Sequence, residues 1–135
     1  QRLGANVVTT LRLFPGISAD ATRNTLDKPV RGAVLECYGA GTGPDEDDAL
    51  MDVFAQATDQ GVVVVAVTQC LTGRVTLETY AAGSALARAG VVGGRDMTTE
   101  AALTKLRYLL DSGLDPATVR EMIGRDLRGE LTEEV

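Results

Sequence analysis

The fold of this chain is decided by the stretch Gly61-Val62-Val63-Val64-Val65-Ala66-Val67-Thr68-Gln69-Cys70. Its continuous run of valine and alanine favours a strand that is buried on both faces. Gly61 ends the helical pattern before this run, and Thr68 to Cys70 place polar side chains where the run stops. Strands buried on both faces are typical of parallel sheets covered by helices, so the stretch predicts an α/β fold.

Apolar segments alternate with helical patterns on both sides of this stretch, as they do in successive β-α units. The expected strands are residues 6–14, 32–38 and 62–67, with a brief strand or extended connector at residues 91–92. The expected helices are a short one that Ser18 caps and that stops before Pro29, and others at residues 45–59, 78–89, 98–110 and 116–127. The pattern predicts a Rossmann-like three-layer domain, with a small, mainly parallel sheet of about four strands flanked by helices.

Two of the helix starts carry local signals. Asp115-Pro116 combines a capping side chain with a proline in the first turn, which is a common way for a helix to begin. Asp96, or the threonine at position 98, can cap the helix that starts near residue 98. This capping role accounts for Asp96 without any part in catalysis.

Length and composition fit one soluble domain that spans residues 1–135. The chain has 44% apolar residues, which is enough for one core of ordinary size. Its net charge of -6 and its pI near 4.6 disfavour nucleic acid and anionic membranes as partners. The apolar runs are shorter than the roughly 20 residues that a membrane-spanning helix needs. Because Cys37 and Cys70 are too few for a disulfide framework, a cytoplasmic location is expected.

The chain contains no histidine, which restricts its chemistry. Ser-His-Asp and Cys-His mechanisms need an imidazole base, so the chain alone cannot use them, and a zinc site of the usual kind is not expected. We therefore expect no metal and no cofactor. The Gly39 to Gly43 loop lacks the spacing of a dinucleotide or phosphate loop, and the acidic residues 45–48 that follow it would repel a polyanion.

Polar residues follow the ends of several expected strands, at Pro15-Gly16, at residues 37–43 and at residues 68–70. Ligands of open parallel sheets bind at this edge, so any site is expected there. The loop with Thr42 is either a tight strand-to-helix turn or a turn that brings backbone amides to a small ligand. Cys37 is expected to be a buried strand-end thiol, and Cys70 a pocket-lining residue rather than a nucleophile. Tyr80 can simply anchor a helix rich in small residues.

Three strings stand out: Thr68-Gln69-Cys70 with Gly73, Tyr80-x-x-Gly83, and Asp96-Met97-Thr98 continuing to Thr104-Lys105-Leu106. Together with the DLRGELT ending at residues 126–132, they resemble the carboxy-terminal domain of type I, cytosolic L-asparaginases. The resemblance covers essentially the whole chain. It implies a domain of an amidohydrolase that converts L-asparagine to L-aspartate and ammonia. The threonine nucleophile of that family lies in an amino-terminal domain, in a TGGT string that is absent here, so no catalytic residue is expected and the chain alone should be inactive.

The resemblance also implies roles for particular residues. In the family this domain makes dimer contacts and, together with its own amino-terminal domain, forms homodimers or homotetramers in which it completes the active site of the partner subunit. Thr42 and Tyr80 match positions near that shared site, although many members have asparagine where Thr42 stands. Cys70 and Glu36 match positions of a regulatory asparagine site. Because the bacterial members with this regulatory site have an arginine at the place of Glu36, and a carboxylate repels the carboxylate of asparagine, we predict weak or absent activation.

Two alternatives stay open. The amidase subunit of archaeal-type glutamyl-tRNA amidotransferases shares the fold and the Tyr80-x-x-Gly83 and Asp96-Met97 strings, whereas residues 68–70 and the DLRGELT ending favour asparaginase. A free-standing small-molecule-binding or interaction module with the same fold is the other alternative. The chain begins at Gln1 and becomes strand-like at Val7, which suggests an excised domain. A TGGT segment upstream in the parent gene would separate the enzymes from the module.

Overall fold

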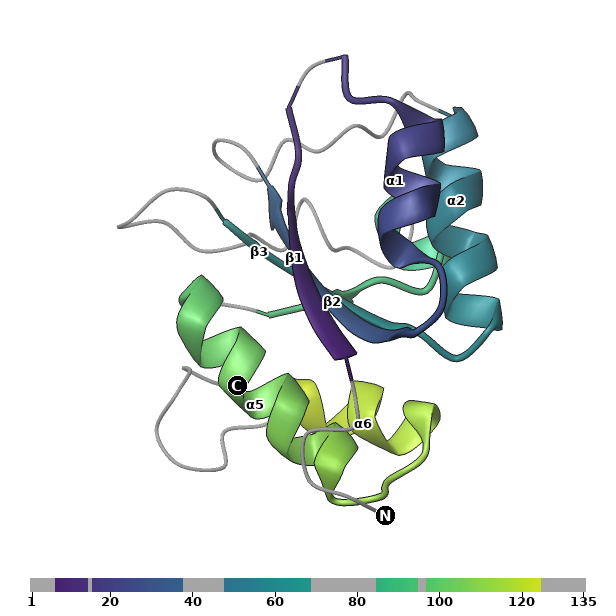
Figure 1. The fold of residues 1–135 in the computed structure, drawn as a ribbon. Helices are drawn as coiled ribbons and strands as arrows, with labels where there is room; N and C mark the ends of the chain where they lie inside the picture. The colour runs from purple at the N-terminus through teal and green to yellow at the C-terminus, as the bar shows by residue number, and fades with distance from the viewer. Residues whose placement is uncertain (1–6, 15, 38–47, 69–84, 95–96, 125–135) are drawn as a thin grey trace.

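A computed structural model of the chain describes residues 7–14, 16–37, 48–68, 85–94 and 97–124. In this part, four strands form one parallel sheet in the order β1-β2-β3-β4 (Figure 1). The strands are β1 (Val7–Arg12), β2 (Val30–Cys37), β3 (Val63–Thr68) and β4 (Val92–Gly93). The helices are α1 (Ala19–Leu26), α2 (Asp48–Asp59), α4 (Ala85–Arg88), α5 (Thr99–Asp111) and α6 (Pro116–Ile123). The predicted α/β fold with a small parallel sheet is confirmed.

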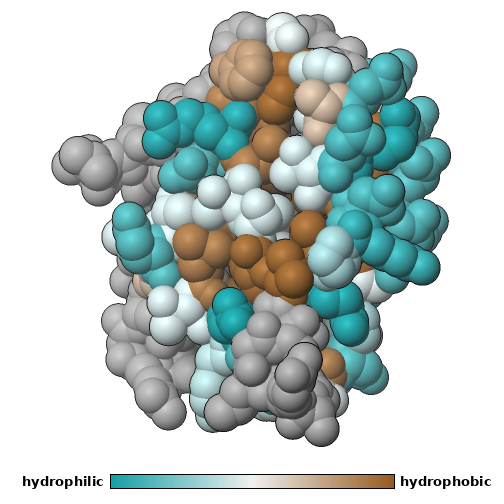
Figure 2. All heavy atoms as spheres, viewed as in Figure 1, coloured by the Kyte–Doolittle hydropathy of each residue, from teal (hydrophilic) through white to brown (hydrophobic). Residues whose placement is uncertain are grey.

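Helices cover both faces of the sheet (Figure 1). Each new strand is added at the same side of the sheet, in the order β1-β2-β3-β4. Because β-α-β crossovers are right-handed, the helices α1, α2 and α4 that make these crossovers pack on the same face. The opposite face would be exposed without α5 and α6, which follow the last strand and cover it. Figure 2 shows a hydrophilic surface over α1 and α2 and apolar atoms along the sheet between the two helix layers. The three-layer prediction is therefore confirmed.

Strand β3 lies inside the sheet, between β2 and β4. The side chains of Val63 to Val67 are 0% exposed. Val64 and Ala66 pack on the side of the crossover helices, and Val63, Val65 and Val67 pack on the side of α5 and α6. Both faces of this strand are dry, which explains why the valine run shows no alternation with polar residues.

Three helices begin at residues whose side-chain oxygen accepts a hydrogen bond from a backbone N–H three residues further on: Ser18 for α1, Thr98 for α5 and Asp115 for α6. The expected caps at Ser18 and Asp115 are confirmed. For α5 the cap is Thr98, while Asp96 lies outside the described residues. Hydrogen bonds from the side chain and the backbone of Thr118 lower the pKa of Asp115, because they stabilise its ionised form.

Helix α6 ends at Ile123, not near Leu127 as the sequence predicts. The ammonium group of Lys105, on α5, donates a hydrogen bond of 3.0 Å to the carbonyl of Ile123. A cation at the carboxyl end of a helix satisfies a carbonyl that has no partner within the helix and interacts well with the helix dipole. Lys105 is only 7% exposed, so this contact is buried between the two helices. The end of α6 thus coincides with this tertiary contact and with a local signal, the glycine at position 124.

Two expected helices are described only in part. The helix expected at residues 78–89 is described from Ala85 to Arg88, and that expected at residues 45–59 from Asp48 to Asp59. Along α2, the residues expected to form the apolar stripe are buried, namely Leu50, Val53, Phe54 and Ala57. Across the described ranges, we find no helix with the length and hydropathy that crossing a membrane demands.

Candidate functional site

The parallel strands β1, β2 and β3 end at one edge of the sheet, which we call the carboxyl edge, at Arg12, Cys37 and Thr68. Adjacent strands are in register there, with Arg12 beside Glu36. The first residue of α5, Thr99, reaches the same edge and contacts Glu36. Since the strand order shows no reversal, the described sheet lacks the crevice at which doubly wound folds bind ligands. The amino end of α5 contacts this edge through Thr99.

Glu36 is the one predicted site residue that falls within the described residues. Its side chain is 17% exposed, and its Oε2 accepts a hydrogen bond of 2.7 Å from the hydroxyl of Thr99. The Nε of Arg12 lies 3.5 Å from Oε1 of Glu36. Because the side chain of Arg12 is 69% exposed, water screens this ion pair, and pairs of this kind contribute about 0–1 kcal/mol. The carboxylate is therefore held in place by donors from β1 and α5.

Sequence reasoning missed Arg12 and Thr99 as neighbours of Glu36. Arg12 could have been found from the expected register of two adjacent parallel strands that end together. Thr99 is 63 residues away from Glu36 in the chain, and its position depends on how α5 returns over the sheet. No local sequence pattern predicts how α5 packs over the sheet.

The other predicted site residues, Thr42, Cys70 and Tyr80, lie outside the described residues, so their roles stay predictions. Cys37 is described and is a buried cysteine at the end of β2, as expected. Its side chain packs in the core on the side of the crossover helices. In the described ranges, no group of three or more His, Cys, Asp or Glu side chains is placed to hold a metal ion.

A hollow of about 130 Å³ lies between α1 and α2, away from the carboxyl edge. It is lined by Arg23, Leu26, Asp27, Val53, Gln56, Ala57 and Gln60. These residues lie toward the carboxyl ends of the two helices, which lead into the amino ends of β2 and β3. The hollow is thus at the opposite end of the sheet from Glu36, and we do not include it in the candidate site.

Comparison with known proteins reveals closely similar domains. The model of the glutaminase/asparaginase C-terminal domain matches residues 7–123. L-asparaginase 1 of Escherichia coli K12 is 49% identical over 125 residues, which are 93% of this chain and 37% of that protein. The crystal structure of L-asparaginase I from Vibrio cholerae has a TM-score of 0.86 at 44% identity, over 93% of this chain and 37% of that chain.

Proteins with other names contain a similar domain. The human 60 kDa lysophospholipase is 48% identical over 126 residues, which are 93% of this chain and 22% of that protein. One subunit of the glutamyl-tRNA(Gln) amidotransferase of Methanothermobacter thermautotrophicus is 39% identical over 93% of this chain and 28% of that protein. In each case the chain spans well under half of the relative. These matches and the parallel four-stranded sheet show that the chain belongs to the family of glutaminase and asparaginase C-terminal domains.

Proposed function

We propose that the chain is the carboxy-terminal domain of an L-asparaginase, an amidohydrolase that converts L-asparagine to L-aspartate and ammonia. The observation that carries this proposal is the 49% identity to L-asparaginase 1 of E. coli over 93% of the chain. The similarity to the glutamyl-tRNA(Gln) amidotransferase is lower, at 39% identity, so asparagine hydrolysis is favoured over transamidation. The sequence has no histidine and no TGGT string, which supports a nucleophile outside residues 1–135.

In this proposal the domain contacts its own amino-terminal domain and completes the active site of a partner subunit in a cytoplasmic homodimer or homotetramer. Thr42 and Tyr80 are the residues proposed to reach that shared site. The position of Thr42 in the sequence supports this role, because Thr42 comes shortly after Cys37, at which β2 ends on the carboxyl edge.

A chimera tests the proposed function. The carboxy-terminal domain of E. coli L-asparaginase 1 is replaced by residues 1–135, and ammonia release from L-asparagine is measured for the chimera, for residues 1–135 alone and for the E. coli amino-terminal part alone. Of these three samples, only the chimera should release ammonia, because the proposal divides the active site between the two domains. The unaltered E. coli enzyme is the positive control.

Either of two results would contradict the proposal. Ammonia release by residues 1–135 alone would show that the nucleophile is in this chain. A chimera that folds and assembles like the unaltered enzyme, yet releases no ammonia, would show that the domain does not support this reaction.

We also propose that asparagine does not activate this protein through a site that includes Glu36 and Cys70. The support is electrostatic, because Glu36 presents a carboxylate that Thr99 and Arg12 already hold, and a second carboxylate would be repelled. Calorimetric titration of residues 1–135 with L-asparagine should show no binding below a Kd of about 1 mM, which corresponds to about -4 kcal/mol. The matched Glu36→Arg variant, with a cation at this position, should bind more tightly. Micromolar binding by the unaltered chain would contradict the proposal.

A further inference from the structure

The contact of Glu36 with Arg12 and Thr99 joins three elements at the carboxyl edge. Arg12 ends β1, Glu36 is the residue before the last of β2, and Thr99 begins α5. We call these three side chains the carboxylate clamp. Because the clamp joins β1, β2 and α5, which are far apart in the sequence, it is a tertiary contact and not part of any single element.

The sheet register explains why the three side chains meet. Arg12, Glu36 and Val67 are neighbours across β1, β2 and β3, and side chains of paired residues in a parallel sheet project from the same face. Val67 packs with Met97, Ala102 and Leu106, so this is the face that α5 covers. The carboxylate of Glu36 is therefore confined between the sheet and the first turn of α5.

The surroundings of this carboxylate have the chemistry of an anion-binding site. The guanidinium of Arg12 lies 3.5 Å away, and the hydroxyl of Thr99 donates a hydrogen bond of 2.7 Å. The amino end of α5 adds the positive end of the helix dipole. These features recognise a carboxylate, and none of them requires that it be attached to β2.

We infer that the corner between Arg12 and Thr99 is a carboxylate-binding site that the protein fills with its own Glu36 side chain. The ligand class is a small monocarboxylate. Substitution of Glu36 by alanine removes a methylene group and a carboxylate, which are the heavy atoms of acetate, and leaves the donors of Arg12 and Thr99 in place. Acetate or formate should then bind in the space that the side chain leaves. This inference does not depend on the proposed catalytic function.

The test is thermal unfolding of residues 1–135 at pH 7, in sodium acetate and in sodium chloride of equal ionic strength. The Glu36→Ala variant should unfold at a lower temperature than the unaltered chain in chloride. Acetate at about 100 mM should raise the Tm of this variant by about 3–6 °C more than that of the unaltered chain, if the Kd is on the order of 10 mM. Acetamide, which has the shape of acetate without its charge, should have no such effect.

Two further variants separate binding at this corner from a general effect of acetate. Glu36→Gln keeps the space filled, so its Tm should respond to acetate no more than that of the unaltered chain. Glu36→Ala combined with Thr99→Val lacks the hydroxyl donor, so the response should fall by at least half. An equal response of the unaltered chain and Glu36→Ala, or a full response in either further variant, would overturn the inference.

If Glu36→Ala does not fold in chloride, the yield of folded protein after dilution from urea replaces the Tm. Acetate should then increase the yield of this variant, as measured by circular dichroism, while chloride and acetamide should not. Equal yields in acetate and chloride would overturn the inference.

Discussion

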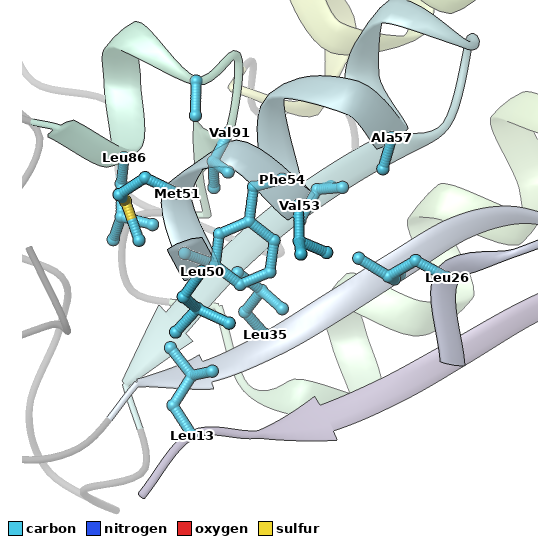
Figure 3. Packing of buried hydrophobic residues seen from close by; sticks show 14 of the residues in the cluster. Leu13, Leu26, Leu35, Leu50, Met51, Val53, Phe54, Ala57, Leu86 and Val91 are labelled. Atoms are coloured by element: carbon cyan, nitrogen blue, oxygen red, sulfur yellow. The ribbon is translucent and has the colours of Figure 1, made fainter. Parts of the chain in front are cut away.

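Replacement of Phe54 by alanine should lower the free energy of unfolding by about 3–5 kcal/mol. The Phe54 side chain is 0% exposed and lies in the core between α2 and the sheet, near Leu50, Val53 and Leu35 (Figure 3). Alanine would leave a cavity lined by these side chains, and the hydrogen-bonded strands beneath them cannot move in to fill it. Since domains of this size are stable by only about 5–15 kcal/mol, the loss is a large fraction of the total.

Urea unfolding followed by circular dichroism measures this change, and Phe14 provides a matched control. Phe14 is 53% exposed, so Phe14→Ala removes the same atoms from a largely hydrated site and should change the free energy of unfolding by no more than about 1 kcal/mol. Equal losses for the two variants would contradict the view that burial of Phe54 against the sheet stabilises this domain.

The Gly90→Ala variant should lose about 2–4 kcal/mol, from backbone strain and from a steric clash. Gly90 has φ of +94°, in the left-handed region that residues with a Cβ rarely adopt. A Cβ at this position would lie 2.7 Å from Oγ1 of Thr58 and 3.0 Å from its Cβ. Thr58 cannot easily move away, because its hydroxyl donates a hydrogen bond of 2.6 Å to the carbonyl of Ala89.

Gly113 separates the two causes. Its φ is +79°, and a Cβ there would meet no atom within 4 Å, so Gly113→Ala should cost only the backbone strain, about 1 kcal/mol. Urea unfolding of both variants gives the difference. The double variant Thr58→Ala, Gly90→Ala should lose less than the sum of the two single variants, because the closest contact, with Oγ1 of Thr58, is then removed. Additive losses, or equal losses for Gly90→Ala and Gly113→Ala, would contradict the predicted clash.

Much of the fold can be predicted from the sequence because its signals are local. The valine run at residues 62–67 predicts a strand with two buried faces, and β3 has them. Ser18 and Asp115 each cap the helix that the sequence assigns to them, since capping requires only the residues next in the chain. The predicted end of α6 is wrong, because the helix ends before Gly124, where Lys105 on another helix also contacts the carbonyl of Ile123.

The candidate site can be predicted only in part. Glu36 stands out through the resemblance to the family, and the structure shows it at the carboxyl edge. The proposed roles of Thr42, Cys70 and Tyr80 stay predictions. The partners of Glu36 do not follow from the sequence pattern, since the contact with Thr99 depends on the path of α5 over the sheet.

The α/β class, most of the helices and strands, and the family resemblance can be read from the sequence, because apolar periodicity, caps and motif strings depend on neighbouring residues. The three-dimensional structure was needed to show that the crossover helices share one face, that α5 and α6 cover the other, and that Arg12 and Thr99 contact Glu36. The strand order and the packing of α5 and α6 on the sheet depend on how apolar surface is buried across the whole chain. Side chains that are far apart in the sequence meet only after both sheet faces are covered.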